Sequence, residues 1–261
     1  MRFATYNVWN EDEKGVGIRF EQLIQEITNV NADIIALQEV TTKFYQDAVN
    51  ALKIYQYSVF RNYSGEDEGL AIFSKSPFED CTFLDTYAEY SRSNALNALL
   101  KVGKATFSVT NVHLPWDSIK VKEEQAVAID RFIHEQREAA DYFIMLGDFN
   151  CSPNSSVHRF LVGDQTLYGN ESKPYWLEVS SNFAILNNTV LLPTLDCINN
   201  PRWKGKNSIY VPENCDRIYI MDNWNYFAFK NVQLFGTEIS PVTKLCASDH
   251  YGVMADIDLS K

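Results

Sequence analysis

The sequence has 261 residues, a length that one hydrophobic core can still organise. Its hydrophobic fraction of 46% and aromatic fraction of 13% exclude a disordered composition. A net charge of −11 argues against broad binding of nucleic acid through a basic face, although a nuclease remains compatible because bound divalent cations invert the local charge.

The N-terminal part predicts two strands and two helices. Residues 2–8 form the first strand, and a polar loop follows over 10–17. Apolar residues at helical spacing predict a helix over 19–30. The short apolar run at 34–37 is typical of a strand that is buried on both faces, and a second helix is expected over 42–52.

The middle of the chain predicts strand after strand. Turn signals separate the apolar runs, and Val102-Gly103-Lys104 is typical of a tight hairpin turn. The expected strands cover residues 57–63, 70–74, 81–87, 95–102 and 105–113.

The C-terminal part mixes helices, strands and one long irregular segment. The longest helix is expected over 119–139, and it leads into a buried strand at 142–146. Ser155 is a candidate N-cap for a helix over 156–162. The segment 163–207 is rich in Pro, Asn, Trp and Tyr and predicts loops. The closing strands are expected at 215–221, 224–232 and 251–259.

These elements predict an α/β fold, a sandwich of two mixed, mainly antiparallel sheets flanked by helices. There is no evident repeat and no linker that would divide the chain. We therefore expect a single domain over residues 1–261.

The five cysteines are scattered, and no pair has zinc-ligand spacing, so buried reduced thiols are expected. The chain enters strand-like sequence at once, and no apolar run reaches the roughly 18 residues that a membrane span needs. These features favour a cytoplasmic protein with no membrane span. No protein partner is implied, and we expect a monomer.

The stretch from Met145 to Pro153 carries the first candidate site. Gly147 permits a close backbone approach or a positive φ. If the chain stays extended, Asp148 and Asn150 point to one face, where they can hold a water, a phosphate oxygen or a hard metal ion. The alternative is a simple strand-capping turn.

Further polar side chains follow the ends of other predicted strands. Each has an ordinary structural explanation: His113 as a satisfied core histidine, Asp216 as the partner of Arg217, and the others as caps or turns. These explanations do not account for so many clusters at the ends of strands that share a sheet. The clusters are Asn7, Glu39, His113, Asp216 and the pair Asp249-His250.

Together they suit metal-assisted attack on a phosphate. Glu39 is a hard oxygen ligand for Mg²⁺, or Mn²⁺, and Asp249 and Asn7 are placed to complete or orient its shell. Asp148 is expected to orient and deprotonate a water, which Asn150 helps to hold.

The histidines complete this hypothesis. His250 and His113 can donate hydrogen bonds to the non-bridging oxygens as negative charge develops on them. Asp216 is expected to fix the tautomer of His250 and favour its charged form.

Five short motifs resemble, in order, the signatures of the endonuclease/exonuclease/phosphatase superfamily. The resemblance implies a four-layered α/β/β/α sandwich and Mg²⁺- or Mn²⁺-dependent phosphoester hydrolysis. It also implies that Glu39 binds the metal, that Asp148 positions the nucleophilic water, and that Asp216 and His250 form a dyad at the phosphate. The motifs are Thr5-Tyr6-Asn7, Leu37-Gln38-Glu39-Val40, Asn111-Val112-His113-Leu114, Gly147-Asp148-Phe149-Asn150 and Ser248-Asp249-His250-Tyr251-Gly252.

Within this superfamily the chain is most similar to the tyrosyl-DNA phosphodiesterase type 2 branch. The motif Pro193-Thr194-Leu195-Asp196 also resembles that branch, which carries Thr-Trp-Asp there. Two positions depart from the branch: Ser152 replaces an Arg, and Leu195 replaces the Trp of that motif. Loss of a planar cation and an aromatic platform weakens the case for a DNA 5′ end as substrate.

The sequence predicts a phosphodiesterase acting on a phosphate ester, with a nucleic-acid end as the first candidate substrate. A small phosphorylated metabolite or a lipid head group is the alternative. A non-catalytic binding module of the same fold is the rival from another class. It predicts that an essential group has been lost, and none is missing here.

Overall fold

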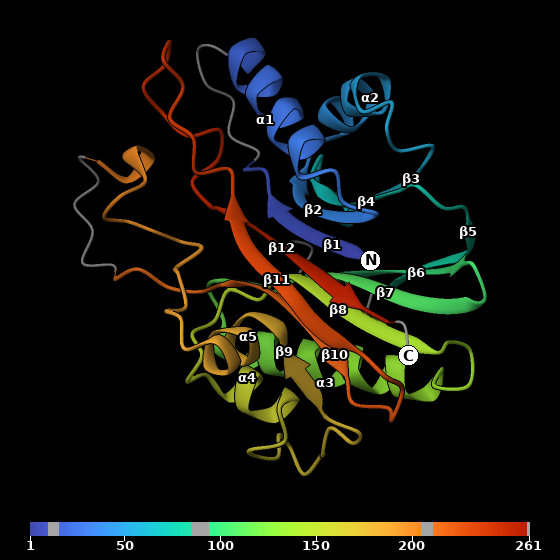
Figure 1. The fold of residues 1–261 in the computed structure, drawn as a ribbon. Helices are drawn as coiled ribbons and strands as arrows, with labels where there is room; N and C mark the ends of the chain where they lie inside the picture. Colours follow the sequence, from blue (N-terminus) through green and yellow to red (C-terminus); the bar gives the residue numbers. More distant parts are fainter. Residues whose placement is uncertain (10–15, 85–93, 205–210, 260–261) are drawn as a thin grey trace.

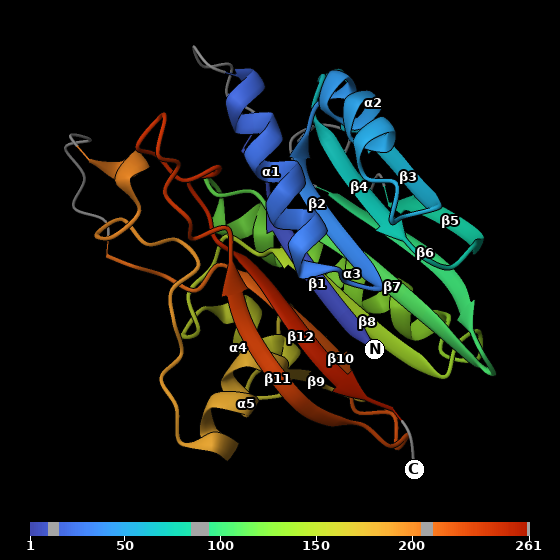
Figure 2. The ribbon, with the colours of Figure 1, turned by 45° about the horizontal axis from the view of Figure 1, so that its top comes forward.

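The computed structural model describes residues 1–9, 16–84, 94–204 and 211–259. Two six-stranded sheets pack face to face with helices outside them (Figure 1). This arrangement confirms the predicted four-layered α/β/β/α sandwich, and Figure 2 shows the layers from a second direction.

The first sheet is built from β1 (Arg2–Asn7), β2 (Ile34–Val40), β3 (Tyr57–Asn62), β4 (Gly69–Ser74), β11 (Ala228–Phe235) and β12 (Gly252–Asp258). Its strand order is β11-β12-β1-β2-β4-β3. Only β1 and β2 are parallel, and every other neighbouring pair is antiparallel. The parallel register places Asn7 beside Gln38, so polar groups at the ends of β1 and β2 meet at one edge.

The second sheet is built from β5 (Phe78–Leu84), β6 (Asn94–Val102), β7 (Ala105–His113), β8 (Tyr142–Asp148), β9 (Trp176–Glu178) and β10 (Asp216–Met221). The order is β5-β6-β7-β8-β10-β9, with β7 and β8 as the parallel pair. The register aligns His113 with Asp148, and Asp148 with Asp216. Three predicted site residues are therefore neighbours across three adjacent strands.

Helices cover the outer faces of both sheets. α1 (Val16–Val30) and α2 (Thr42–Ala51) pack on the first sheet, and α3 (Ile119–Glu135) and α4 (Ser156–Leu161) pack on the second (Figure 2). α5 (Val179–Asn187) contacts β10 and β11. Across the described ranges, no helix combines the length and the apolar character that crossing a membrane requires.

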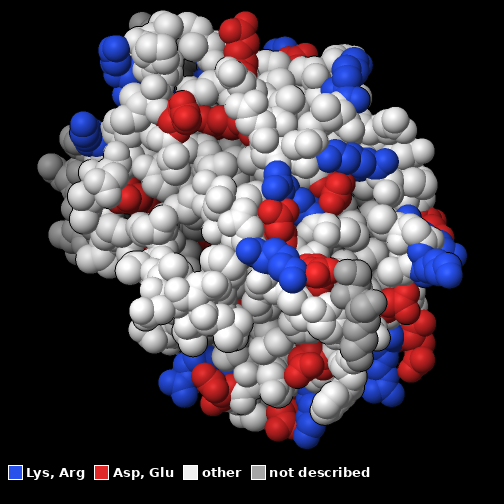
Figure 3. Space-filling model, in the orientation of Figure 1, with Lys and Arg blue, Asp and Glu red and all other residues white. Residues whose placement is uncertain are grey.

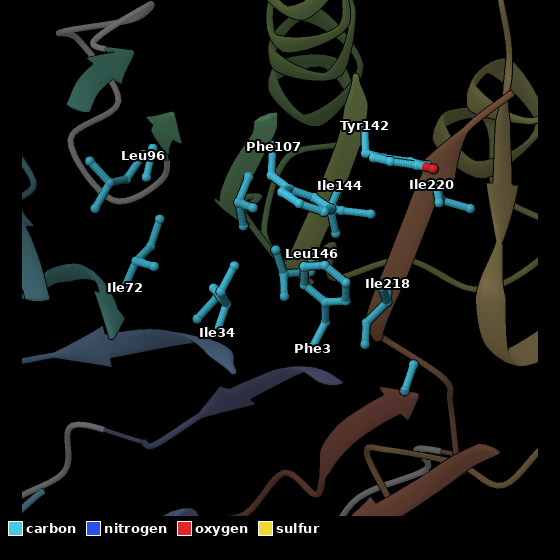
Figure 4. Close-up of a cluster of buried hydrophobic side chains, with 14 of the residues drawn as sticks. Phe3, Ile34, Ile72, Leu96, Phe107, Tyr142, Ile144, Leu146, Ile218 and Ile220 are labelled. Atoms are coloured by element: carbon cyan, nitrogen blue, oxygen red, sulfur yellow. The ribbon is translucent and has the colours of Figure 1, made fainter. Parts of the chain in front are cut away.

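The largest part of the core lies between the two sheets (Figure 4). Phe3 and Ile34 from the first sheet meet Ile144, Leu146 and Ile218 from the second, and all five are inaccessible to solvent. Burying side chains of this size contributes about 1.5–3 kcal/mol each. The strand ends that carry the polar clusters are thus fixed to a rigid interior.

The structure corrects the predicted helix over 119–139, because α3 ends at Glu135. The backbone N–H of Gln136 bonds to the carbonyls of Ile133 and His134, and turns follow in place of helix. The predicted closing strand at 224–232 is shifted, since β11 begins at Ala228.

The segment 163–207 also differs from the prediction, because it contains β9 and α5. The side chain of Glu178 accepts hydrogen bonds from the backbone N–H groups of Ser180 and Ser181, and so caps α5. Two other predictions are tested only in part. Residues 85–87 of one predicted strand and 10–15 of one predicted loop lie outside the described residues.

Candidate active site

The penultimate residue of β8 is a glycine that no other residue can replace without rearrangement. Gly147 has φ +147°, and a Cβ there would lie 1.8 Å from the carbonyl oxygen of Val112 in β7. The predicted close backbone approach is confirmed. It draws β7 and β8 together where His113 and Asp148 end their strands.

Asp148 and Asn150 meet through a turn, which corrects the expectation of an extended chain. Asn150 has φ +47°, and its backbone N–H donates to Asp148 Oδ1 at 2.8 Å. Its side-chain Nδ2 donates to the carbonyl oxygen of Leu114 at 2.9 Å and lies 3.3 Å from Asp148 Oδ2. Lys122 Nζ donates to the carbonyl of Asn150. Hydrogen bonds with Asp148, Leu114 and Lys122 therefore hold the turn in this conformation.

Three other predicted site residues surround the second carboxylate oxygen of Asp148. Asn7 Nδ2 donates to Oδ2 at 3.0 Å. His113 Nε2 and His250 Nε2 lie 3.8 and 3.9 Å from the same oxygen. Asp148 is 1% exposed, so its charge acts in a medium of low polarity, where electrostatic interactions are strong.

Asn7 connects Asp148 to the second candidate carboxylate. The same Nδ2 lies 2.9 Å from Glu39 Oε1. Glu39 has φ +56°, and the register of β2 shifts between Leu37 and Val40. This irregularity changes the direction in which the Glu39 side chain points, and β-bulges commonly have this effect beside active sites.

His250 and Asp216 form a buried pair, as predicted. His250 Nδ1 lies 2.9 Å from Asp216 Oδ2, and the two side chains are 9% and 0% exposed. Burial alone lowers the pKa of His250, but the carboxylates of Asp216 and Asp148 outweigh it and hold that pKa well above its usual value. Nδ1 therefore donates to Asp216, and Nε2–H is directed toward Asp148.

The alternative pairing of Asp216 with Arg217 is absent. Arg217 Nη2 donates instead to the carbonyl oxygens of Cys151 and Asn214. Successive residues of a strand point to opposite faces, which separates Asp216 from Arg217 in spite of their adjacency.

His113 has a partner that the sequence did not indicate. Its Nδ1 lies 2.9 Å from the hydroxyl of Tyr63, which is 1% exposed. Burial holds the pKa of Tyr63 well above its usual value, so its phenol keeps its proton. When that phenol donates to Nδ1, the proton of a neutral His113 ring is on Nε2, which faces Asp148.

Asp249 lies at the same end of the sandwich. It is 8% exposed, its charge acts on the adjacent His250, and its backbone carbonyl accepts a hydrogen bond from Trp203 Nε1 at 3.1 Å. Ser248 Oγ donates to the carbonyl of Asn7 at 2.7 Å, which holds the Asp249-His250 segment against β1.

The chemistry of the donor set fits a hard divalent cation. Glu39 and Asp148 place carboxylate oxygens 2.9 and 3.0 Å from the Asn7 amide, and Asp249 carries a further carboxylate at this end; carboxylate oxygens are the ligands that Mg²⁺ prefers. One set of three groups, Asp148, Asp216 and His250, has ligand atoms within 4.8 Å of one another. Asp216 Oδ1 is buried and has no hydrogen-bond partner among the described residues.

Several motif residues form a hydrogen-bond network between the two sheets, next to the site. Gln38 Nε2 donates to Thr5 Oγ1 and to Asn111 Oδ1, at 3.0 and 2.7 Å, and Asn111 returns hydrogen bonds to the carbonyls of Leu37 and Ala71. This amide bridge joins the two sheets directly beneath the site.

The backbone of Asp216 is held by Thr194, a residue that the sequence analysis named only as part of a motif. Thr194 Oγ1 accepts hydrogen bonds from the N–H groups of Cys215 and Asp216, both at 3.0 Å. A fixed position in the Thr-Leu-Asp motif was the one signal that could have identified Thr194.

Sequence comparison assigns the chain to a family. The model of the Endonuclease/Exonuclease/phosphatase family matches residues 4–250, and the chain belongs to that family. The predicted recognition is confirmed.

Particular relatives can then be named. The probable CCR4-Not complex 3′-5′-exoribonuclease subunit Ccr4 of Vairimorpha ceranae is 27% identical over 230 residues, which cover 72% of this chain and 48% of that protein. The chain thus spans about half the length of this curated relative.

Solved structures share the fold. Truncated Caenorhabditis elegans TDP2 has a TM-score of 0.79 and 16% identity, covering 99% of this chain and 97% of that one. D. rerio TDP2, complexed with a single strand DNA product, has a TM-score of 0.79 and 18% identity, covering 99% and 98%. An endonuclease/exonuclease/phosphatase from Bacteroides vulgatus has a TM-score of 0.76 and 18% identity, covering 99% and 98%.

Proposed function

We propose that this chain is a Mg²⁺- or Mn²⁺-dependent phosphodiesterase that acts on a nucleic-acid end. The observation that carries the proposal is the convergence of Asn7, His113 and His250 on one oxygen of Asp148. A buried carboxylate surrounded by amide and imidazole donors suits the task of holding a water and taking its proton.

Each side chain has a separate role in this proposal. Asp148 orients and deprotonates the attacking water, and Asn7 and Asn150 keep its carboxylate in place. His250, held charged by Asp216, donates from Nε2 to a non-bridging phosphate oxygen, where negative charge grows as the water attacks. His113 donates from Nε2 to the same group.

Glu39, Asn7 and Asp249 would hold the divalent cation. When bound, the cation supplies positive charge that draws the phosphate into an otherwise acidic site. This assignment agrees with the net charge of −11, because the chain lacks a basic excess that could perform the same task.

A nucleic-acid end is favoured over long duplex by the charge of the surface. On the face drawn in Figure 3, Lys and Arg residues are interspersed with Asp and Glu, and no continuous basic track runs across it. The names of the relatives agree, since one is a probable exoribonuclease and one is a TDP2 complexed with a single strand DNA product.

The first test measures hydrolysis of bis-p-nitrophenyl phosphate with Mg²⁺, with Mn²⁺ and with EDTA. We expect Asp148→Asn and His250→Ala each to lower kcat by about 10²–10⁴-fold, the usual contribution of one positioned acid-base group. His158→Gln is a matched control, because His158 bonds to Tyr219 OH and takes no part in the Asp148 cluster.

A second test separates the substrates. A 5′-phosphotyrosyl oligonucleotide, an abasic duplex and a phospholipid are compared under the same conditions. Activity that survives EDTA would contradict metal dependence, and inactivity on the whole panel would favour a binding module. Preference for the phospholipid would exclude the nucleic-acid end.

A further inference from the structure

Trp116 has a large, solvent-exposed aromatic side chain. It lies at the end of the sandwich that carries His113 and Asp148. It lies three residues after His113 and is 74% exposed. Three residues span at most about 11 Å, so the Cα of Trp116 lies within that distance of the Cα of His113. Tryptophan is enriched at binding interfaces, because its large apolar surface gains from burial against a partner.

The loop that carries Trp116 is fixed at both ends. The backbone N–H of Leu114 donates to the carbonyl of Asp148 at 2.9 Å, and Asn150 Nδ2 donates to the carbonyl of Leu114 at the same distance. At the other end Ser118 caps α3, with Oγ accepting from the N–H of Val121. The backbone on either side of Trp116 is therefore held relative to the turn that carries Asp148 and Asn150.

Two other tryptophans at this end, Trp9 and Trp203, make contacts within the protein. The ring of Trp9 has the guanidinium carbon of Arg202 at 4.6 Å and that of Arg19 at 5.6 Å from its centroid. Trp203 donates its indole N–H to the carbonyl of Asp249. Among the described tryptophans at this end, Trp116 is the most exposed.

We propose that Trp116 stacks on the base of the nucleotide adjacent to the scissile phosphate, so that the substrate is an end with an unpaired terminal base. The inference rests on the proposed phosphodiesterase function. Stacking on an aromatic ring accepts any base, because every base has a π face. It also supplies affinity that an acidic surface cannot obtain from phosphate contacts.

The experiment uses two single-stranded oligonucleotides that carry a p-nitrophenyl ester on the 5′ phosphate. One has an ordinary first nucleotide, and the other has an abasic first residue. With the ordinary oligonucleotide, Trp116→Ala is expected to raise KM by about 5–100-fold, the range that one stacked base provides, with kcat within about twofold. With the abasic oligonucleotide, we expect KM to stay unchanged, and Trp116→Phe should retain most of the affinity for the ordinary one.

Trp224→Ala is the matched control. Trp224 is 95% exposed, but it follows β10 at the far end of the sandwich, where Asn223 and Asn225 bond to the carbonyl of Asp141. Its removal should change neither KM.

Two results would overturn the inference: no change in KM for Trp116→Ala, or an equal change with both oligonucleotides. In either case cleavage of the oligonucleotides by the unaltered protein would leave the proposed function standing. If the unaltered protein cleaves bis-p-nitrophenyl phosphate but neither oligonucleotide, both the nucleic-acid substrate and the stacking role are refuted.

Discussion

Single side chains at the site are held by hydrogen bonds to neighbouring polar groups. Asp148 is held by Asn7 and Asn150, His250 by Asp216, and His113 by Tyr63. Such outer contacts set the orientation and the protonation of the groups that they touch. Their removal is therefore expected to alter catalysis while the fold remains.

The Tyr63→Phe variant tests this at His113. Without the phenol, the tautomer of a neutral His113 ring is no longer fixed, and the proton can lie on either Nδ1 or Nε2. We expect kcat to fall by about 10–100-fold, as for other outer-contact substitutions. The ¹⁵N chemical shifts of the His113 ring should change from one dominant tautomer to a mixture.

Tyr142→Phe is the control for that variant. Its hydroxyl donates to the carbonyls of Tyr226 and Leu259, and its strand position is at the opposite end of β8 from Asp148. Its kcat should match that of the unaltered protein. A Tyr63→Phe variant with unchanged kcat and unchanged ring shifts would show that the phenol only fills space.

At the scale of elements, the sequence predicted the central strands well. Their apolar runs are strong signals, and the polar residues at their ends identified Asn7, His113 and Asp148. It could not predict the positive φ angles of Glu39 and Asn150, because contacts with other strands impose them.

Two further elements escaped prediction for local reasons. β9 has three residues, too few for a periodic pattern. α5 carries Ser and Asn, which favour caps and turns, and its stability depends on packing against β10 and on the cap that Glu178 provides. Tyr63 was missed for the same kind of reason, since only the packing of one sheet against the other brings it to His113.

The end of α3 contains a titrating group whose effect on stability can be measured. Burial lowers the pKa of His134, but the hydrogen bond and charge of Asp130, with the carbonyl of Pro174, raise it to about 9. A raised pKa means that the folded state binds the proton more tightly. The contribution is complete below pH 6.5 and is lost as the pH rises through about 9.

Urea unfolding at pH 6 and at pH 9.5 tests this. After allowance for the partial exposure of the ring, we expect the unaltered protein to lose about 1 kcal/mol more than His134→Gln over this interval. His158→Gln is the comparison of opposite sign: burial lowers the pKa of His158 to about 4, so protonation of this ring in the unfolded chain destabilises the fold below pH 6.5, and the variant should lose more stability over the interval than the unaltered protein does. Equal losses for His134→Gln and the unaltered protein would exclude the Asp130–His134 contribution.

On the scale of the whole molecule, the site depends on two sheets meeting at one end. Asn7 and Glu39 come from the first sheet, and His113, Asp148 and Asp216 come from the second. The amide bridge between Gln38 and Asn111 fixes the separation of the sheets beneath them. Carboxylates from both sheets therefore gather in a chain whose net charge is already −11, and their mutual repulsion opposes folding.

A bound cation should relieve that repulsion and stabilise the whole fold. At a Mg²⁺ concentration ten times its Kd, mass action contributes about 1.4 kcal/mol, which raises Tm by about 3–5 °C. Differential scanning fluorimetry at constant ionic strength measures this without relying on activity. Glu39→Gln should lose most of the increase, whereas Glu138→Gln, whose side chain is 94% exposed and remote from the cluster, should retain it. If Na⁺ at the same ionic strength gives an equal increase, charge screening accounts for the effect and Glu39 is not a specific ligand.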